Sequence, residues 1–263
     1  FVSNFVGDTA FAAINLIIPV TSILGGVGFM LGTGGSALVA ITLGEQKGEL
    51  ANRYFTMMIW ISIIVGIVLS IVGLAVMKPI AVLLGATDGM LSHCVLYGSI
   101  TMGFNVSFML QYALQAFLIA AEKPNLGLVT TVAAGVTNMV LDALFIAVFN
   151  WGVAGAAIAT GLSQCVGAVI PLVYFLRSKS SPLRLIKTKL EVKPILKACV
   201  NGSSEMISNA TSAIIGIIYN FQLLKYAGES GVASYGVLMY VQFVFAAIFI
   251  GYSMGSAPII SYH

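Results

Sequence analysis

Charged residues are scarce in this sequence. They make up 8% of its 263 residues, whereas hydrophobic residues make up 59%. A soluble globular domain carries about 25% charged residues, so a chain with this few could not cover its surface with water-compatible side chains. The scarcity excludes a soluble enzyme or binding domain, and the mean hydropathy of +1.02 indicates a membrane protein.

Motifs of catalysis are also missing. The three cysteines, Cys94, Cys165 and Cys199, lie far apart in apolar stretches without a Cys-x-x-Cys pair, and we interpret them as packing residues. There is no glycine-rich phosphate loop followed by lysine, which argues against direct use of ATP. The Ser–His pair, zinc cluster or paired Asp motifs of an intramembrane protease are not visible either. We therefore expect no enzyme, no metal site and no cofactor, and an ion gradient as the driving force.

Long apolar runs are what the sequence has in abundance. Runs of more than about 18 apolar residues are typical of membrane-spanning helices, because lipid offers backbone groups no hydrogen-bond partners. The runs lack strict period-two alternation, which favours helices over the strands of a barrel. We predict an all-α polytopic membrane protein with a helix remnant at 1–6 and seven spans: Ala10–Leu43, Asn52–Met77, Leu91–Ala121, Asn125–Phe149, Gly152–Arg177, Pro194–Lys225 and Ser230–Tyr262.

Basic residues are divided unequally between the two sets of connectors that join these spans. Lys78 and Lys225 lie in one set, and the other ten of the 12 lie in the second. Because cytoplasmic connectors carry such an excess, we predict that the connectors 44–52, 121–125 and 177–194 face the cytoplasm. The ten residues are Lys47, Arg53, Lys123, Arg177, Lys179, Arg184, Lys187, Lys189, Lys193 and Lys197.

The connector 177–194 is the longest and the most basic, and it reads RSKSSPLRLIKTKLEVKP. One interpretation is a linker between two helix bundles that lies on anionic lipid headgroups. Another is an ordinary loop that sets the topology, and the two are compatible. Membrane spans on both sides of the connector argue against a nucleic-acid partner.

The sequence also repeats itself. The segment GDTAFA at 7–12 resembles GESGVA at 228–233, and GSA at 35–37 recurs at 255–257. The offset of about 220 residues corresponds to six helices, so the repeats are parallel. We expect a fragment of a longer protein with two six-helix lobes. It would comprise residues 1–177 as the N-terminal lobe, 178–193 as a basic cytoplasmic linker, and 194–263 as the start of the C-terminal lobe.

Several motifs resemble those of one transporter family. The loop GEQKGELANR at 44–53 does not fit the GxxxDRxGRR signature of the major facilitator type, but it is similar to the loop of MATE (multidrug and toxic compound extrusion) proteins. NMVLD at 138–142, followed by GVAGAAIAT at 152–160, resembles the N-x-x-L-D and G-V-x-G-A-A-x-A-T motifs of that family. The resemblance covers the whole chain and is greatest to MepA-like members near the DinF branch.

The resemblance implies a MATE-type fold of twelve helices, of which this chain lacks most of helix 1 and everything after helix 8. It implies an antiporter in the bacterial inner membrane that exports lipophilic cationic drugs and dyes in exchange for H⁺ or Na⁺. Drugs and membrane lipids are then its partners, and it is a monomer when full length. The alternative is a flippase for lipids or lipid-linked sugars from the related superfamily. A passive channel or an assembly scaffold is a rival from another class.

Two acidic residues lie deep within the predicted spans, Asp142 and Glu205. A charge at the middle of a membrane costs about 2.5 kcal/mol or more, so such residues usually face a cavity or a partner. A carboxyl there can exchange a proton for a cation, because burial favours its protonated form and a bound cation its ionised form. We predict that Asp142, with Asn138 one turn before it, and Glu205 couple transport to cations. For Glu205 the alternative is a buried acid neutralised by nearby hydroxyls.

Polar and aromatic side chains recur at helical spacing on four of the spans. Such stripes predict either the walls of a cavity or polar contacts between helices. We expect a substrate cavity lined by Asn15, Tyr97, Thr101, Gln111, Tyr112, Gln115 and Gln164, with Thr160 near the coupling residues. The resemblance implies that Asn138, Asp142, Tyr97, Gln115 and Thr160 match the first-lobe cation or proton site of the family, and Glu205 a cation-binding Glu of NorM-type members.

Overall fold

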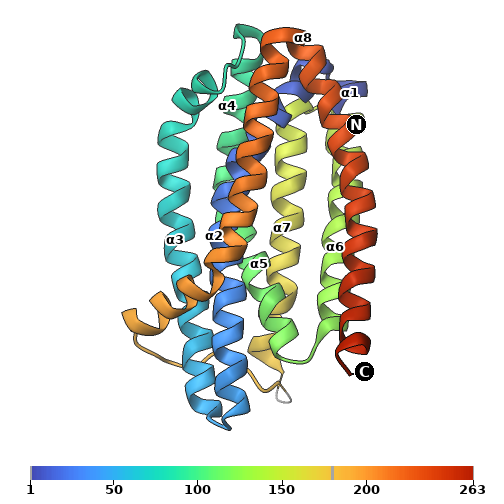
Figure 1. Cartoon of the computed structure of the whole chain (residues 1–263). Coiled ribbons are helices and arrows are strands. Elements are labelled where there is room, and N and C mark those ends of the chain that lie inside the picture. Colours follow the sequence, from blue (N-terminus) through green and yellow to red (C-terminus); the bar gives the residue numbers. More distant parts are fainter. Residues whose placement is uncertain (1, 179–180, 263) are drawn as a thin grey trace.

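Helices account for almost the whole chain in the computed structural model, which describes residues 2–178 and 181–262, with side chains as far as residue 249. No strand occurs among these residues (Figure 1). Phe1 and Lys179, which the sequence predictions include, lie outside the described residues. The elements are α1 (Val2–Phe5), α2 (Asp8–Gly44), α3 (Gly48–Leu83), α4 (Asp88–Gly103), α5 (Asn105–Ala120), α6 (Pro124–Asp142), η1 (Ala143–Val148), α7 (Gly152–Arg177) and α8 (Val192–Tyr262).

Five of the described helices are long and apolar enough to cross a membrane, and the pair α4–α5 would make a sixth span. The prediction of an all-helical chain with membrane spans is thereby confirmed. The connectors after α2, α5 and α7, which carry most of the basic residues, lie together at one end of the bundle (Figure 1). The charge asymmetry of the sequence therefore becomes an asymmetry between the two ends of the molecule.

The predicted span Leu91–Ala121 is present as a bent pair of helices rather than as one straight helix. The chain forms two helices, α4 and α5, which are bent by 54° at Phe104. The Phe104 ring fills the space beside Gly161 of α7, where an added Cβ would lie 2.1 Å from the ring. Buried Asn105 donates its side-chain amide to the Gly66 carbonyl of α3 at 3.4 Å. These two side chains are inserted between helices at the bend. The hydropathy of the sequence does not reveal such contacts.

The third helix is longer than predicted. It continues beyond Met77 to Leu83, so Lys78 lies inside a helix rather than in a connector, and Pro79 lies inside it too. Lys78 is exposed, and a long side chain near the end of a span can carry its ammonium to the headgroup region while its stem stays in apolar surroundings. A single charge near a helix end therefore did not end the helix.

The predicted span Asn125–Phe149 changes its winding partway along. It begins as α6 at Pro124, and directly after Asp142 the backbone becomes the π-helical segment η1. Such π-helical segments are rare and frequently occur at functional sites. The acid singled out by the sequence therefore stands at the junction of two helix types.

The break between the last two predicted spans is confirmed at Gly228, which has φ 63° and ψ −162° inside α8. Its counterpart in the internal repeat, Gly7, has φ 113° directly before α2. Positive φ is open mainly to glycine, so both glycines turn the chain at the start of a long helical stretch. The acid after Gly228, Glu229, accepts hydrogen bonds from Thr9 of α2 (2.6 Å) and from Thr87 at the start of α4.

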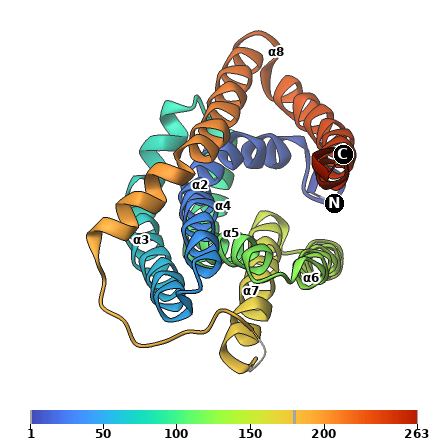
Figure 2. The same ribbon diagram turned by 60° about the horizontal axis from the view of Figure 1, so that its bottom comes forward.

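Helix α8 consequently has two arms, 192–227 and 229–262, and the first arm runs along α2 (Figures 1 and 2). The two backbones approach closely at a pair of glycines. A Cβ added to Gly34 would lie 1.9 Å from the Ala198 carbonyl oxygen, and one added to Gly202 would lie 2.1 Å from that of Met30. Small residues allow such close crossings in membranes, and this crossing positions the polar face of α8 opposite α2.

Candidate functional site

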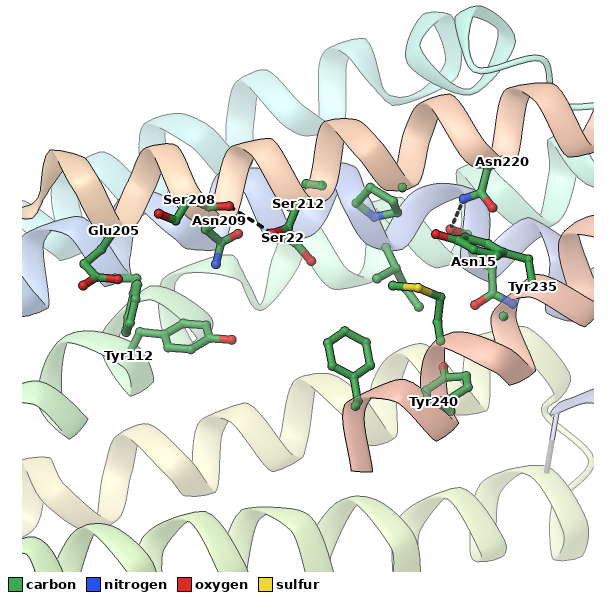
Figure 3. A pocket seen from close by; sticks show the side chains of 18 residues that line it. Asn15, Ser22, Tyr112, Glu205, Ser208, Asn209, Ser212, Asn220, Tyr235 and Tyr240 are labelled. Carbon is green, nitrogen blue, oxygen red and sulfur yellow. Dashed lines mark hydrogen bonds between the residues drawn. The ribbon is translucent and has the colours of Figure 1, made fainter. Parts of the chain in front are cut away.

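A cavity of about 490 Å³ lies between α2, α5 and the two arms of α8 (Figure 3). Its volume is within the range of about 300–1,000 Å³ that is typical of small-molecule sites. Both arms of α8 contribute to it because the turn at Gly228 brings the second arm back beside the first. The polar and aromatic residues that line it are Asn15, Ser22, Phe29, Tyr112, Glu205, Ser208, Asn209, Ser212, Asn220, Tyr235, Tyr240 and Phe243.

Glu205 lies at one end of this cavity, near Tyr112, with Ser208 and Asn209 on the following turn of α8 (Figure 3). Its side chain is exposed, so it is not a buried acid neutralised by neighbouring hydroxyls. Ser212 continues the same stripe, although its hydroxyl donates to the Ser208 carbonyl at 3.0 Å. The i, i+3, i+4 spacing of α8 thus presents a carboxylate and several neutral polar groups to the space.

Aromatic rings form much of the remaining wall. Tyr112 packs edge-to-face on Phe29 with ring centroids 5.6 Å apart, and Tyr235 stacks on Tyr219 at 5.3 Å. Tyr240 lies at the end away from Glu205, close to Asn15 (Figure 3). The negative faces of such rings attract cations, most strongly where water is excluded. No Lys or Arg is among the described residues that line this cavity, so its electrostatics favour positive charge.

A second, smaller cavity of about 40 Å³ lies among α2, α4, α5 and α7. Four residues that the sequence predicts as site residues meet there: Tyr97, Thr101, Thr160 and Gln164. Tyr97 of α4 and Thr160 of α7 thus lie on opposite sides of one small space. The Thr101 hydroxyl donates to the carbonyls of its own helix, at 2.9 Å to Tyr97 and 3.0 Å to Gly98. The space is large enough for a water molecule or a small cation.

Asp142 and Asn138 line neither of these cavities. Asp142 is the last residue of α6 and directly precedes η1. Its Oδ1 atom is buried and has no hydrogen-bond partner within the described part of the chain. An unsatisfied buried oxygen costs about 1–3 kcal/mol, more when it is charged, so this atom is ready to accept a proton or a cation.

Gln111 and Gln115 do not reach either cavity, contrary to the cavity wall predicted from their helical stripe. Gln111 fills the space beside Gly167 of α7, where an added Cβ would lie 2.6 Å from its Cδ. Gln115 donates to Thr131 Oγ1 at 2.7 Å and to the Gly127 carbonyl at 3.3 Å, and so joins α5 to α6. The alternative interpretation of polar stripes, contact between helices, describes these two residues.

Most of the α8 residues that line the large cavity were not predicted from the sequence. Asn209 and Asn220 follow Glu205 at helical spacing, so extending the stripe would have found them. Tyr235 and Tyr240 belong to the second arm, and their place depends on the turn at Gly228, which sequence spacing does not give. Among the described residues, no group of three or more His, Cys, Asp or Glu is arranged to hold a metal ion.

The amino-acid sequence is similar to that of known membrane proteins. The family model MatE matches residues 1–144 of the chain. The multidrug export protein MepA of Staphylococcus saprophyticus is 27% identical over 263 residues, which cover 99% of this chain and 58% of the relative. MepA of Staphylococcus aureus (strain MRSA252) is 27% identical over 254 residues, with 96% and 56% coverage. The chain therefore spans little more than half the length of these relatives.

Solved structures share the arrangement of helices. The MATE multidrug transporter DinF-BH, in complex with a dye, superimposes with a TM-score of 0.90 at 26% identity, covering 100% of this chain and 59% of its own. An inward-facing MATE transporter of the MOP superfamily superimposes with a TM-score of 0.85 at 22% identity, covering 92% and 56%. At that lower identity the likeness shows the fold alone.

Proposed function

The chain belongs to the MATE family, and on this premise we propose that the full-length protein exports small lipophilic cations in exchange for H⁺ or Na⁺. It is a multi-pass membrane protein, as its apolar helices and its family indicate. The observation that carries the proposal is the large cavity, where one carboxylate and several aromatic rings meet without a lysine or arginine among the described lining residues.

The substrate class follows from this lining. A lipophilic cation combines apolar surface with positive charge, and the rings of Phe29, Tyr112 and Tyr240 offer both apolar contact and cation–π attraction. Glu205 supplies the only formal charge among the described lining residues, and neutral Ser and Asn groups can adapt to substrates of different shapes. The relatives support the same class, because MepA is named a multidrug export protein and DinF-BH is a multidrug transporter solved with a dye.

The coupling ion is assigned to the region of Asp142. Its buried Oδ1, unpartnered among the described residues, gains a bond when a proton or a cation arrives. An ion bound at Asp142 therefore changes the net charge of the helix bundle that also binds the substrate. That link makes binding of a coupling cation and of a cationic drug mutually unfavourable, which is what exchange requires.

The rival function, a flippase for lipid-linked sugars or lipids, requires recognition of anionic phosphate groups. Arg and Lys are the side chains that bind phosphate, and the described linings of both cavities contain none. A passive channel differs in another way, because it conducts ions without moving drug in the opposite direction. Transport measurements separate all three possibilities.

The deciding experiment reconstitutes the full-length protein in vesicles loaded with a fluorescent cationic dye. We expect dye movement when a pH gradient or a Na⁺ gradient is imposed, saturation at high dye concentration, and no movement without a gradient. Imposing each gradient separately identifies the coupling ion. Ion flux that is independent of dye indicates a channel, and translocation of lipid-linked anions without dye export indicates a flippase; either result would contradict the proposal.

A further inference from the structure

The longest connector of the chain is held in a defined position across α3. After Ser181, the backbone amide of Arg184 donates to Asn52 Oδ1 at 2.7 Å, and that of Ile186 donates to Thr56 Oγ1 at 3.1 Å. Leu183 is fully buried in the apolar core at this end of the bundle. The connector runs around the outer side of α3 (Figure 2), so the residues that follow these bonds are placed at the perimeter of the bundle.

These bonds create a basic pocket. A cavity of about 420 Å³ is lined by Arg53 of α3 and by Lys187, Thr188, Lys189 and Glu191 of the connector. The amide of Glu191 approaches Met57 Sδ at 3.3 Å, which closes the connector over the helix. Three cations face one carboxylate, leaving a surplus of two positive charges. Among the described residues, none of the three cations has an ion pair.

An apolar ridge continues from this pocket along the same face of α3. Trp60, Ile64, Ile67 and Ile71 follow Arg53 at helical spacing and are between 41% and 64% exposed. The ridge from Trp60 to Ile71 rises ~16 Å, about the thickness of one leaflet of hydrocarbon. Tryptophan prefers the boundary between headgroups and hydrocarbon, and Arg53 lies two turns from Trp60 on the side of the connector.

We propose that this pocket binds the phosphate of an anionic phospholipid, with the acyl chains of that lipid lying along the α3 ridge. Free phosphate would share the contacts with Arg53, Lys187 and Lys189 but would leave the ridge unused. The charge surplus selects anionic over zwitterionic headgroups. The bound lipid braces the connector against α3.

The test titrates the full-length protein in detergent with phosphatidylglycerol, phosphatidylcholine or inorganic phosphate and counts bound molecules by native mass spectrometry. We expect phosphatidylglycerol to bind at least tenfold more tightly than phosphatidylcholine, and inorganic phosphate to bind weakly. Each basic residue near an anionic group contributes a factor of about five, so the variant Arg53→Gln, Lys187→Gln, Lys189→Gln should lose about 100-fold in affinity for phosphatidylglycerol.

The matched control removes three charges at the same end but outside the pocket, with Lys123→Gln, Lys193→Gln and Lys197→Gln. It should bind phosphatidylglycerol within a factor of a few of the unaltered protein. A double variant, Lys187→Gln with Lys189→Gln, leaves α3 intact and should lose an intermediate amount. Equal loss in the control, an unchanged triple variant, equal binding of both lipids, or inorganic phosphate binding as tightly as phosphatidylglycerol would each overturn the proposal.

Discussion

At the scale of single residues, Asp142 illustrates how a carboxyl can serve exchange. One oxygen is buried without a partner among the described residues, and the group stands where α6 gives way to η1. A side chain of the same shape that cannot lose a proton would fill the space but would be insensitive to the ion gradient.

The variant Asp142→Asn should therefore abolish gradient-driven dye efflux by the full-length protein while leaving its expression and folding intact. The amide keeps the size of the side chain and removes the titration and the negative charge. Dye efflux from vesicles under a pH or Na⁺ gradient measures the effect. Asp88→Asn, which alters an exposed acid in the first turn of α4, is the control and should retain transport. Normal efflux by Asp142→Asn contradicts the coupling role.

The sequence predicts a coupling role for Glu205, but its exposed position in the wall of the large cavity leads us to propose a role in substrate affinity instead. Glu205→Gln removes the carboxylate from that wall and should raise the KM for a cationic dye about tenfold, equivalent to ~1.4 kcal/mol. The maximal rate should change little. Initial rates over a range of dye concentrations separate the two parameters, with Glu49→Gln in the first turn of α3 as the control. A lower maximal rate at unchanged KM would argue against this role.

Some residues of the predicted helical stripes line a cavity, and others join one helix to another. Tyr97 and Thr101 on α4 meet Thr160 of α7 in the small cavity, as their shared faces suggest. Beyond the 54° bend between α4 and α5, Tyr112 lines the large cavity, whereas Gln111 packs beside α7 and Gln115 joins α5 to α6. The bend depends on contacts between helices, and the spacing of residues along one helix does not show those contacts.

At the scale of elements, the turn inside α8 decides the shape of the large cavity. Gly228 reverses the direction of the helix, and Glu229 then meets Thr9 of α2 and Thr87 of α4. The sequence repeat predicted a break here, because Gly7 and Gly228 occupy equivalent places. It could not predict that the second arm would bring Tyr240 opposite Asn15, since spacing along one helix says nothing about the angle between two arms.

Gly228→Ala should destabilise the full-length protein by about 1–3 kcal/mol, because φ 63° with ψ −162° is a conformation open almost only to glycine. A steric clash is not the cause of this loss, since an added Cβ at Gly228 would meet nothing within 4 Å. Gly44→Ala is a matched control, with equal space and no positive φ. Thermal unfolding in detergent should show a loss of stability for Gly228→Ala alone; equal stability of both variants would show that the turn is not strained.

At the scale of the whole molecule, the distribution of charge gives the bundle two different ends. The connectors after α2, α5 and α7 lie together at one end and carry most of the basic residues (Figure 1). The pocket around Arg53 is formed by the start of α3 and by the connector after α7. The composition and the apolar runs predicted the helical membrane fold, because lipid restricts the backbone to few solutions. They could not predict that the connector would be pinned to Asn52 and Thr56, which depends on single hydrogen bonds.

The basic end should face the cytoplasm, because Lys- and Arg-rich connectors resist translocation across the membrane. A cysteine placed at Thr188 in the connector should react with an impermeant maleimide only after the membrane is opened. A cysteine at Gly89, in the first turn of α4 at the opposite end, should react in intact cells. The native cysteines are buried or half-buried and provide a low background. Labelling of Thr188→Cys, but not Gly89→Cys, in intact cells would reverse the orientation. It would also move the basic pocket to the leaflet away from the cytoplasm.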